Sequence, residues 1–271
     1  MVTLPDGLRL DGAGQGPPGR EPALVLLPGP TDSWRSYLPV LDHLPPDLRT
    51  VAFSARGHGR SDAPDPEAGH RYDVDTFAAD VASLLDELGI RRAVLVGHSG
   101  SSLVARRVAI DHPEQVAGLV LESSPLTLAG DPDLRTFVEE VVTHLVDPID
   151  PAFVRSFVTG TSSPDVDPDL LDLVLADAAL VRADVWRATF RALATYDDRD
   201  ELARIRAPVR LVWGDADPLV GRAVQDELQR LLPHASLRTF EGAGHTPRWE
   251  QPARFAAELV EAATEGPAST D

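Results

Sequence analysis

The sequence predicts an α/β fold built on a doubly wound, mostly parallel sheet, and two observations support this. Short runs of apolar, β-prone residues recur along the chain, and most are continuous rather than alternating, as in strands covered on both faces. Segments with helical spacing separate these runs, an alternation that is typical of parallel sheets. The predicted strands are residues 23–27, 49–53, 93–97, 116–122, 209–213 and 235–240.

The clearest predicted helix lies between the second and third of these strands. Apolar side chains recur at i, i+3, i+4 and i+7 from Val74 to Leu88, which is the spacing of one helix face. Gly89 follows at the position where a C-terminal cap is expected. This pattern predicts a helix over residues 74–88.

Residues 126–201 interrupt the alternation of strands and helices. This stretch is rich in Asp, Pro and helical apolar spacing, and the strand pattern resumes only at Val209. We predict a core formed by residues 1–125 and 202–271, with residues 126–201 inserted as a helical cap. Residues 264–271 are predicted to be a frayed tail.

Composition argues against several classes of partner and site. The 271 residues carry a formal net charge of −18 and no Lys, so neither nucleic acid nor a membrane surface is an expected partner. There is no Cys and no H-E-x-x-H motif, so we expect no metal and no other cofactor. The sequence lacks a signal peptide pattern and a long apolar run, and its composition is typical of high-GC bacterial genomes. We expect a cytoplasmic monomer or homodimer.

The strand at residues 93–97 runs directly into the sequence GHSGSS, which a helical pattern follows. A Ser on a sharp strand-to-helix turn between small residues is the nucleophile-elbow pattern, and it nominates Ser99 as a nucleophile. Gly97 and Gly100 leave room for the turn, and the helix N-terminus favours developing negative charge. The pattern normally ends in Gly, and this chain has Ser101 there.

Two further candidates follow later strands. Asp215 and Asp217 come after the strand at 209–213, and His245 lies in a Gly-rich loop after the strand at 235–240. With this order of Ser, Asp and His, each after a strand, the chain resembles the α/β-hydrolase superfamily. The loop sequence ARGHGRSDAP, at residues 55–64, is also similar to that family. The resemblance implies an α/β-hydrolase fold whose cap is inserted after the sixth strand.

The resemblance also implies a role for each residue. Ser99 is the expected nucleophile, His245 the general base and Asp217 the acid that orients the imidazole, while Asp215 is expected to cap the turn. Some relatives, including zearalenone-type lactone hydrolases, carry the acid after the sixth strand instead. Glu122 stands at that position and is the alternative acid.

Two prolines complicate the expected oxyanion hole. In relatives, the loop after the third strand reads His-Gly-x, and the N–H of x donates to the oxyanion together with the N–H of the residue after the nucleophile, here Gly100. Aligned on Gly29, this chain has Pro28 and Pro30 at the flanking positions, and proline has no N–H. Either the loop shifts so that Thr31 donates, or Trp34 or a cap residue replaces the donor, or the oxyanion is not stabilised. We expect the first.

The substrate is expected between the cap and the sheet, and an apolar pocket there favours a small, uncharged, hydrophobic molecule. The predicted pocket residues are Pro30, Trp34, His98, Trp186 and Trp249. We therefore predict a serine hydrolase that cleaves a hydrophobic carboxylic ester or lactone through an acyl-enzyme. Three alternatives stay open: a lactone hydrolase using Glu122 as its acid, a non-hydrolytic lyase or cyclase, and a catalytically impaired ligand-binding protein.

Overall fold

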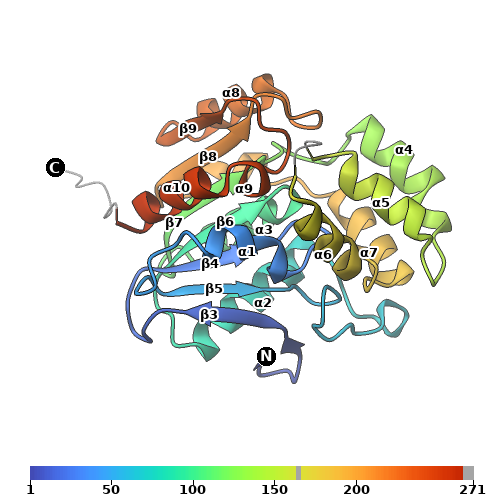
Figure 1. Cartoon of the computed structure of the whole chain (residues 1–271), viewed down its shortest axis with the longest axis horizontal. Helices are drawn as coiled ribbons and strands as arrows, with labels where there is room; N and C mark the ends of the chain where they lie inside the picture. Colours follow the sequence, from blue (N-terminus) through green and yellow to red (C-terminus); the bar gives the residue numbers. More distant parts are fainter. Residues whose placement is uncertain (163–165, 265–271) are drawn as a thin grey trace.

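The computed structural model describes residues 1–162 and 166–264. Within these residues a seven-stranded sheet, the main sheet, has the order β3-β5-β4-β6-β7-β8-β9 (Figure 1). Neighbouring strands are parallel except for the antiparallel pair β3–β5. The strands of the main sheet are β3 (Gly12–Gln15), β4 (Ala23–Leu27), β5 (Thr50–Phe53), β6 (Ala93–His98), β7 (Val116–Glu122), β8 (Val209–Gly214) and β9 (Ala235–Phe240).

The predicted parallel strands are confirmed, with ends that differ by a single residue at most. The sequence prediction missed three short strands. β1 (Val2–Thr3) and β2 (Arg9–Leu10) pair with each other outside the main sheet, and β3 forms its antiparallel edge. β3 reads GAGQ and lacks the β-branched side chains that mark a strand.

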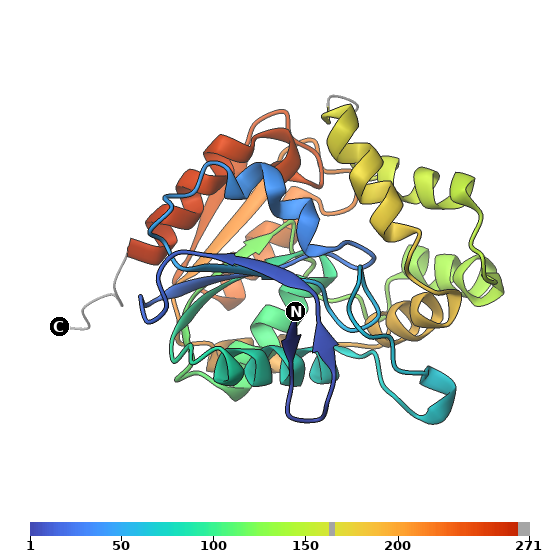
Figure 2. The same cartoon turned by 60° about the horizontal axis from the view of Figure 1, so that its bottom comes forward.

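Helices cover both faces of the main sheet, as Figure 2 shows. On one face, α2 (Val74–Glu87) and α3 (Gly100–Asp111) belong to a large apolar core, which α8 (Arg222–Leu231) extends through Leu228. On the other face, α1 (Leu38–Leu41) and α10 (Pro252–Thr264) enclose a second core. The short helix α9 (Pro247–Glu250) directly precedes α10. Continuous apolar strands are therefore buried on both sides, as the sequence pattern predicts.

Local signals account for the ends of α2. The Asp73 side chain accepts a hydrogen bond from the N–H of Thr76 and caps the helix N-terminus. At the other end, Gly89 adopts a φ of 59°, where glycine is favoured. The predicted helix is thus confirmed.

Residues 126–201, called the cap segment below, separate β7 from β8. Among the described residues this segment contains α4 (Pro132–Glu140), α5 (Pro151–Thr159), α6 (Pro168–Ala178) and α7 (Ala183–Leu193), which lie at one end of the main sheet (Figure 1). α4, α5 and α6 each begin with Asp-Pro, and the Asp side chain caps the helix in each case. The Asp and Pro content of this stretch therefore has a local cause.

The cap segment is inserted between β7 and β8, after the strand at which it was expected. β7 ends at Glu122 and is the strand that corresponds to the sixth of the family pattern, and it is the fifth strand of the main sheet along the described chain. The predicted frayed tail lies outside the described residues apart from Thr264, which ends α10. No helix in the described part of the chain has both the length and the apolar character required to cross a membrane.

Candidate active site

Ser99 occupies a strained turn between β6 and α3. Its backbone has φ 51° and ψ −125°, a conformation that a non-glycine residue rarely adopts. A Cβ on Gly97 would lie 2.6 Å from the Ser101 carbonyl oxygen, so this position requires glycine. Ser101, which replaces the usual Gly, donates from its hydroxyl to the Pro28 carbonyl at 2.5 Å. The elbow is therefore tied to the turn that follows β4.

His245 and Asp217 form a buried pair at the same edge of the main sheet. The Nδ1 atom of His245 lies 2.9 Å from Oδ2 and 3.1 Å from Oδ1 of Asp217. Asp217 Oδ1 also accepts from the N–H groups of Leu219 and Val220, which hold the carboxylate in place. Because Nδ1 donates to a carboxylate, Nε2 is the nitrogen left to accept a proton. No hydrogen bond joins the Ser99 hydroxyl to His245 or to another described residue, so the structure pairs His245 with Asp217 but not with Ser99.

Glu122 faces a different group. One of its carboxylate oxygens accepts from the Arg248 N–H at 2.9 Å, and the other accepts from the Arg248 guanidinium at 3.1 Å. Arg248 also donates to Asp32 at 2.6 Å. The carboxylate that contacts His245 is thus Asp217, and the alternative acid Glu122 is occupied in an ion pair. Asp215 accepts from the Gly242 N–H and braces the neighbouring loop.

Burial shifts the protonation equilibria around this ion pair. It raises the pKa of Asp32 to about 6, although Arg248 opposes the shift. Burial likewise raises the pKa of Glu122. Two carboxylates share one guanidinium here, so the cluster Asp32–Arg248–Glu122 carries excess negative charge when both acids are ionised.

His98 joins two loops of the site. Its Nε2 donates to the His245 carbonyl at 3.0 Å, and its Nδ1 would lie 2.4 Å from a Cβ on Gly29. Burial holds the pKa of His98 well below its usual range, so the ring is neutral. Gly29 is therefore required for close approach to the His98 ring.

The two prolines lie in a tight turn. The Asp32 N–H donates to the Gly29 carbonyl at 3.1 Å, and Thr31 has φ 75°. Pro at the second position and positive φ at the third are the features of a type II turn. Thr31 is 2% exposed, and neither its N–H nor its hydroxyl has a hydrogen-bond partner in the described chain. Pro30 is where the prediction placed it, and it offers no donor.

A cavity of about 40 Å³ lies beside this turn. Pro30 from the turn, Gly100 from the elbow and Thr189 from α7 line it together, although Ser99 and His245 are not among its lining residues. The wall is tight, because a Cβ on Gly100 would lie 2.8 Å from Pro30 Cγ and 3.3 Å from Leu193 Cδ1. Further lining residues are mostly apolar and include Leu27, Phe53, Phe77, Val81 and Val104.

A family model described as the alpha/beta hydrolase fold matches residues 22–252, which include the elbow, the cap segment and the His245 loop. The chain belongs to the α/β-hydrolase family. The non-heme chloroperoxidase of Streptomyces lividans is 31% identical over 259 residues, which cover 90% of this chain and 92% of the relative.

A second relative and a solved structure extend the comparison. The 3-oxoadipate enol-lactonase 2 of Acinetobacter baylyi is 29% identical over 206 residues, covering 76% of this chain and 74% of the relative. An esterase from Exiguobacterium antarcticum has the same fold, with a TM-score of 0.84 and 18% identity, over 97% of this chain and 98% of that one. The enzyme described here is therefore an α/β hydrolase by sequence and by fold.

Pro30 lines the cavity of this α/β hydrolase, but the other four predicted pocket residues do not. The Trp34 indole donates to Asp11, and the Trp249 indole donates to the Ser36 carbonyl. Trp186 is 1% exposed and lies among the cap aromatic rings, stacked on Phe190. His98 bridges loops as described above. Trp186 and Trp249 are buried in packing, the common use of aromatic residues, and Trp34 is half-buried.

Hydrogen bonds join the cap segment to two loops of the candidate site. Asp177 of α6 accepts from the Ser33 hydroxyl at 2.5 Å and from Arg35 at 2.8 Å, just after the Pro30 turn. The His245 N–H donates to the Thr161 carbonyl at 3.3 Å. The cap segment therefore contacts both the turn that carries Pro30 and the loop that carries His245.

Sequence reasoning missed Arg248 and Thr189. Arg248 lies three residues after His245, and nothing in the sequence around it indicates that it is buried and paired. Thr189 is one polar position on the apolar face of a helical pattern, with no motif around it. Only the packing of α7 over the elbow reveals its surroundings.

Proposed function

We propose that this α/β hydrolase is a serine hydrolase that cleaves a carboxylic ester or lactone through an acyl-enzyme on Ser99. The observation that carries the proposal is the buried His245–Asp217 pair, at 2.9 Å, at the strand ends next to the strained Ser99 turn. Glu122 is not the acid in this proposal, because both of its oxygens are engaged by Arg248. The name of the lactonase relative is consistent with an ester or lactone substrate.

The proposed reaction follows from the positions of the protons. His245 Nε2 accepts the Ser99 proton as Oγ attacks the carbonyl carbon, and Asp217 stabilises the imidazolium through Nδ1. The imidazolium then protonates the leaving alkoxide. Water attacks the acyl carbon while His245 takes its proton, and His245 returns a proton to Ser99 Oγ as the carboxylic acid leaves. The Gly100 N–H is at the N-terminus of α3, where it has no intrahelical partner, and it donates to the developing oxyanion.

The size of the cavity restricts the proposed substrate. A volume of about 40 Å³ is well below the roughly 150 Å³ that holds a benzene molecule. The lining is mostly apolar, and the chain carries a net charge of −18, which repels anions. We infer an uncharged substrate whose group in this cavity is short, comparable to an acetyl or propionyl group.

Incubation with a fluorophosphonate tests the proposal, because phosphonylation needs an activated serine and stabilisation of charge on oxygen. We expect a stoichiometric adduct by intact mass that disappears in Ser99→Ala. Trypsin releases residues 93–106, which contain Ser99, Ser101 and Ser102, and fragmentation of this peptide should place the adduct on Ser99. A folded protein that forms no adduct would contradict the proposal and favour a non-hydrolytic or ligand-binding role.

A further inference from the structure

Pro30 leaves one side of the proposed oxyanion site without its usual N–H donor. Pro30 and Gly100 line the same cavity, and the Pro30 ring lies against Gly100. Gly100 supplies an N–H from the helix terminus, whereas Pro30 supplies none. Of the other side chains with a possible donor that line this cavity, Ser101 already donates to the Pro28 carbonyl and His58 faces the Arg56 carbonyl through Nδ1, which leaves Thr189 as the candidate second donor. Thr31, the donor expected from the sequence, does not line it.

Helix α7 forms another wall of this cavity. Thr189 and Leu193 are one turn apart on α7, and both line the cavity. The Leu193 Cδ1 atom lies 3.3 Å from the position of a Cβ on Gly100, so α7 packs directly over the elbow. Thr189 is only 4% exposed. A helix of the cap segment thus places Thr189 at the wall of the cavity that Gly100 also lines.

The Thr189 hydroxyl is buried and has no hydrogen-bond partner among the residues that the structure describes. A threonine within a helix ordinarily satisfies its hydroxyl at the carbonyl four residues earlier. In this chain Thr136, Thr159 and Thr264 all do so, with distances of 2.9 Å. A buried hydroxyl left unpaired is costly, and this one belongs to a residue that lines the cavity, where a ligand can supply the partner.

We propose that the Thr189 hydroxyl donates to the carbonyl oxygen of the substrate and replaces the N–H that Pro30 lacks. This inference rests on the proposed serine hydrolase function. As Ser99 Oγ adds to the carbonyl carbon, the C=O π electrons move onto oxygen, which then accepts from Gly100 N–H and Thr189 O–H. When the leaving group departs, the carbonyl re-forms and both donors are released. The cap segment therefore contributes a catalytic residue.

The test compares Thr189→Val, which keeps the shape and removes the hydroxyl, with Thr189→Ser, which keeps the hydroxyl. We expect Thr189→Val to lower kcat for p-nitrophenyl acetate by roughly 10²–10³ with little change in KM. The rate of Ser99 phosphonylation should fall in parallel, and Thr189→Ser should retain most of both rates. The Tm of Thr189→Val should be unchanged or higher, because an unpaired buried hydroxyl is removed.

Two matched variants sharpen the test. The Thr195 hydroxyl is exposed and donates to the Ala192 carbonyl, so Thr195→Val should behave as wild type. The sequence analysis expected Thr31 to donate to the oxyanion. If Thr189 donates instead, Thr31→Val should change kcat and the rate of Ser99 phosphonylation little. If the wild type is labelled by the fluorophosphonate and Thr189→Val is labelled at the same rate, the role of Thr189 is overturned, but the proposed serine hydrolase function is not. A wild type that is not labelled overturns both. Thr189→Ala repeats the test if Thr189→Val does not fold.

Discussion

Arg248 is fully buried, and its surroundings show how much a single side chain organises in this protein. Its guanidinium contacts Asp32 after the Pro30 turn and Glu122 at the end of β7, while its own backbone follows His245 by three residues. Tyr37 and Trp249 present their rings to the guanidinium. One cation therefore links three loops, but it faces two carboxylates, and this imbalance should cost stability.

The substitution Asp32→Asn tests this imbalance through its dependence on pH. Asp32 has a folded-state pKa of about 6, above its ordinary 3.8, so the folded state binds more protons between these values. Wild-type stability should consequently fall as pH rises from about 4 to about 6, relative to Asp32→Asn, by roughly 1–3 kcal/mol. The groups that face Asp32 are Arg248, Glu122 and His245.

Thermal unfolding of wild type and Asp32→Asn from pH 4 to pH 8 provides the measurement. Asp42 follows α1 and is exposed, so Asp42→Asn is the control and should show no such divergence. A constant difference between wild type and Asp32→Asn across this range would show that Asp32 does not titrate near pH 6.

The unit β6–elbow–α3 combines local strain with close packing. Ser99 adopts its strained turn because the helix begins at once and Gly97 lets the backbone of Ser101 and Ser102 approach β6. Ser102 donates from its hydroxyl to the Ser99 carbonyl, which supports the turn from inside the helix. The element thus carries backbone strain at Ser99 and offsets it with packing and hydrogen bonds.

Gly97 of β6 and Gly118 of the adjacent strand β7 provide a matched comparison of a glycine that close packing requires with one that it does not. A Cβ on Gly97 would meet backbone atoms at 2.6–2.9 Å, whereas a Cβ on Gly118 of β7 would meet Val94 at an ordinary 3.5 Å. We expect Gly97→Ala to cost roughly 1–3 kcal/mol and to abolish labelling of Ser99. Gly118→Ala should stay within about 1 kcal/mol of wild type and keep full labelling. Chemical denaturation of both variants would reveal equal losses if the elbow had no special packing.

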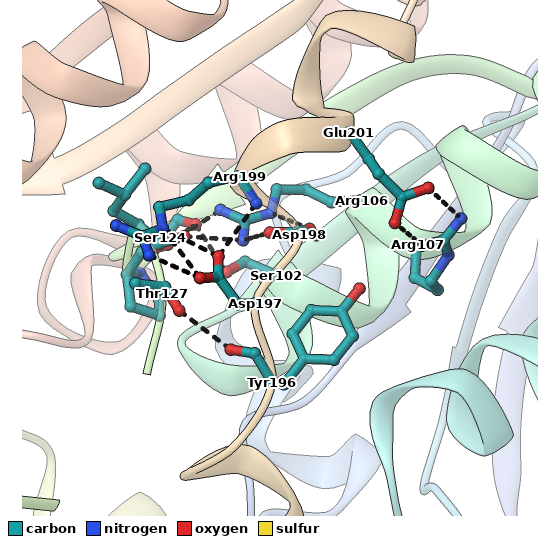
Figure 3. Close-up of polar contacts among 12 residues, drawn as sticks. Ser102, Arg106, Arg107, Ser124, Thr127, Tyr196, Asp197, Asp198, Arg199 and Glu201 are labelled. Atoms are coloured by element: carbon teal, nitrogen blue, oxygen red, sulfur yellow. Dashed lines mark hydrogen bonds and ion pairs between the residues drawn. The ribbon is translucent and has the colours of Figure 1, made fainter. Parts of the chain in front are cut away.

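At the scale of the whole molecule, Arg106 joins the cap segment to the core (Figure 3). It is fully buried in α3 and donates to the carbonyls of Pro125 and Leu126, where the cap segment begins. It also donates to Asp198, near the end of the cap segment, at 2.5 and 3.0 Å. Both ends of the cap segment therefore meet at one guanidinium on the helix behind Ser99.

Removal of Arg106 should lower the free energy of unfolding strongly, because it leaves the buried Asp198 carboxylate without its cation. Burial raises the pKa of Asp198, and Arg106 opposes that shift. We expect Arg106→Met to lower the free energy of unfolding by about 3–5 kcal/mol, and the double variant Arg106→Met/Asp198→Leu to recover much of the loss. Arg222→Met breaks an exposed pair with Asp226 and should cost less than about 1 kcal/mol. Equal losses in the single and double variants would mean that the charge of Asp198 is not the cause.

The sequence by itself determined the parallel strands, helix α2 and the inserted helical segment, and it placed the candidates Ser99, Asp217 and His245 after the ends of three strands. These follow from local chemistry: apolar periodicity marks each element, and strands of a parallel sheet end at one edge, so residues after different strands converge. The sequence also predicted the turn at Ser99, because a turn of this kind requires glycine or small residues beside it.

Only the tertiary structure decided which acid contacts His245, where the tryptophans are buried, and what lines the cavity. The sequence favours Asp217 and leaves Glu122 open as the alternative, and the structure separates them because His245 contacts Asp217 while Arg248 engages Glu122. Thr189 and Gly100 are distant in sequence, yet both reach one cavity because the ends of the cap segment meet on α3. Contacts of this kind depend on how rigid elements pack, and no local pattern encodes them.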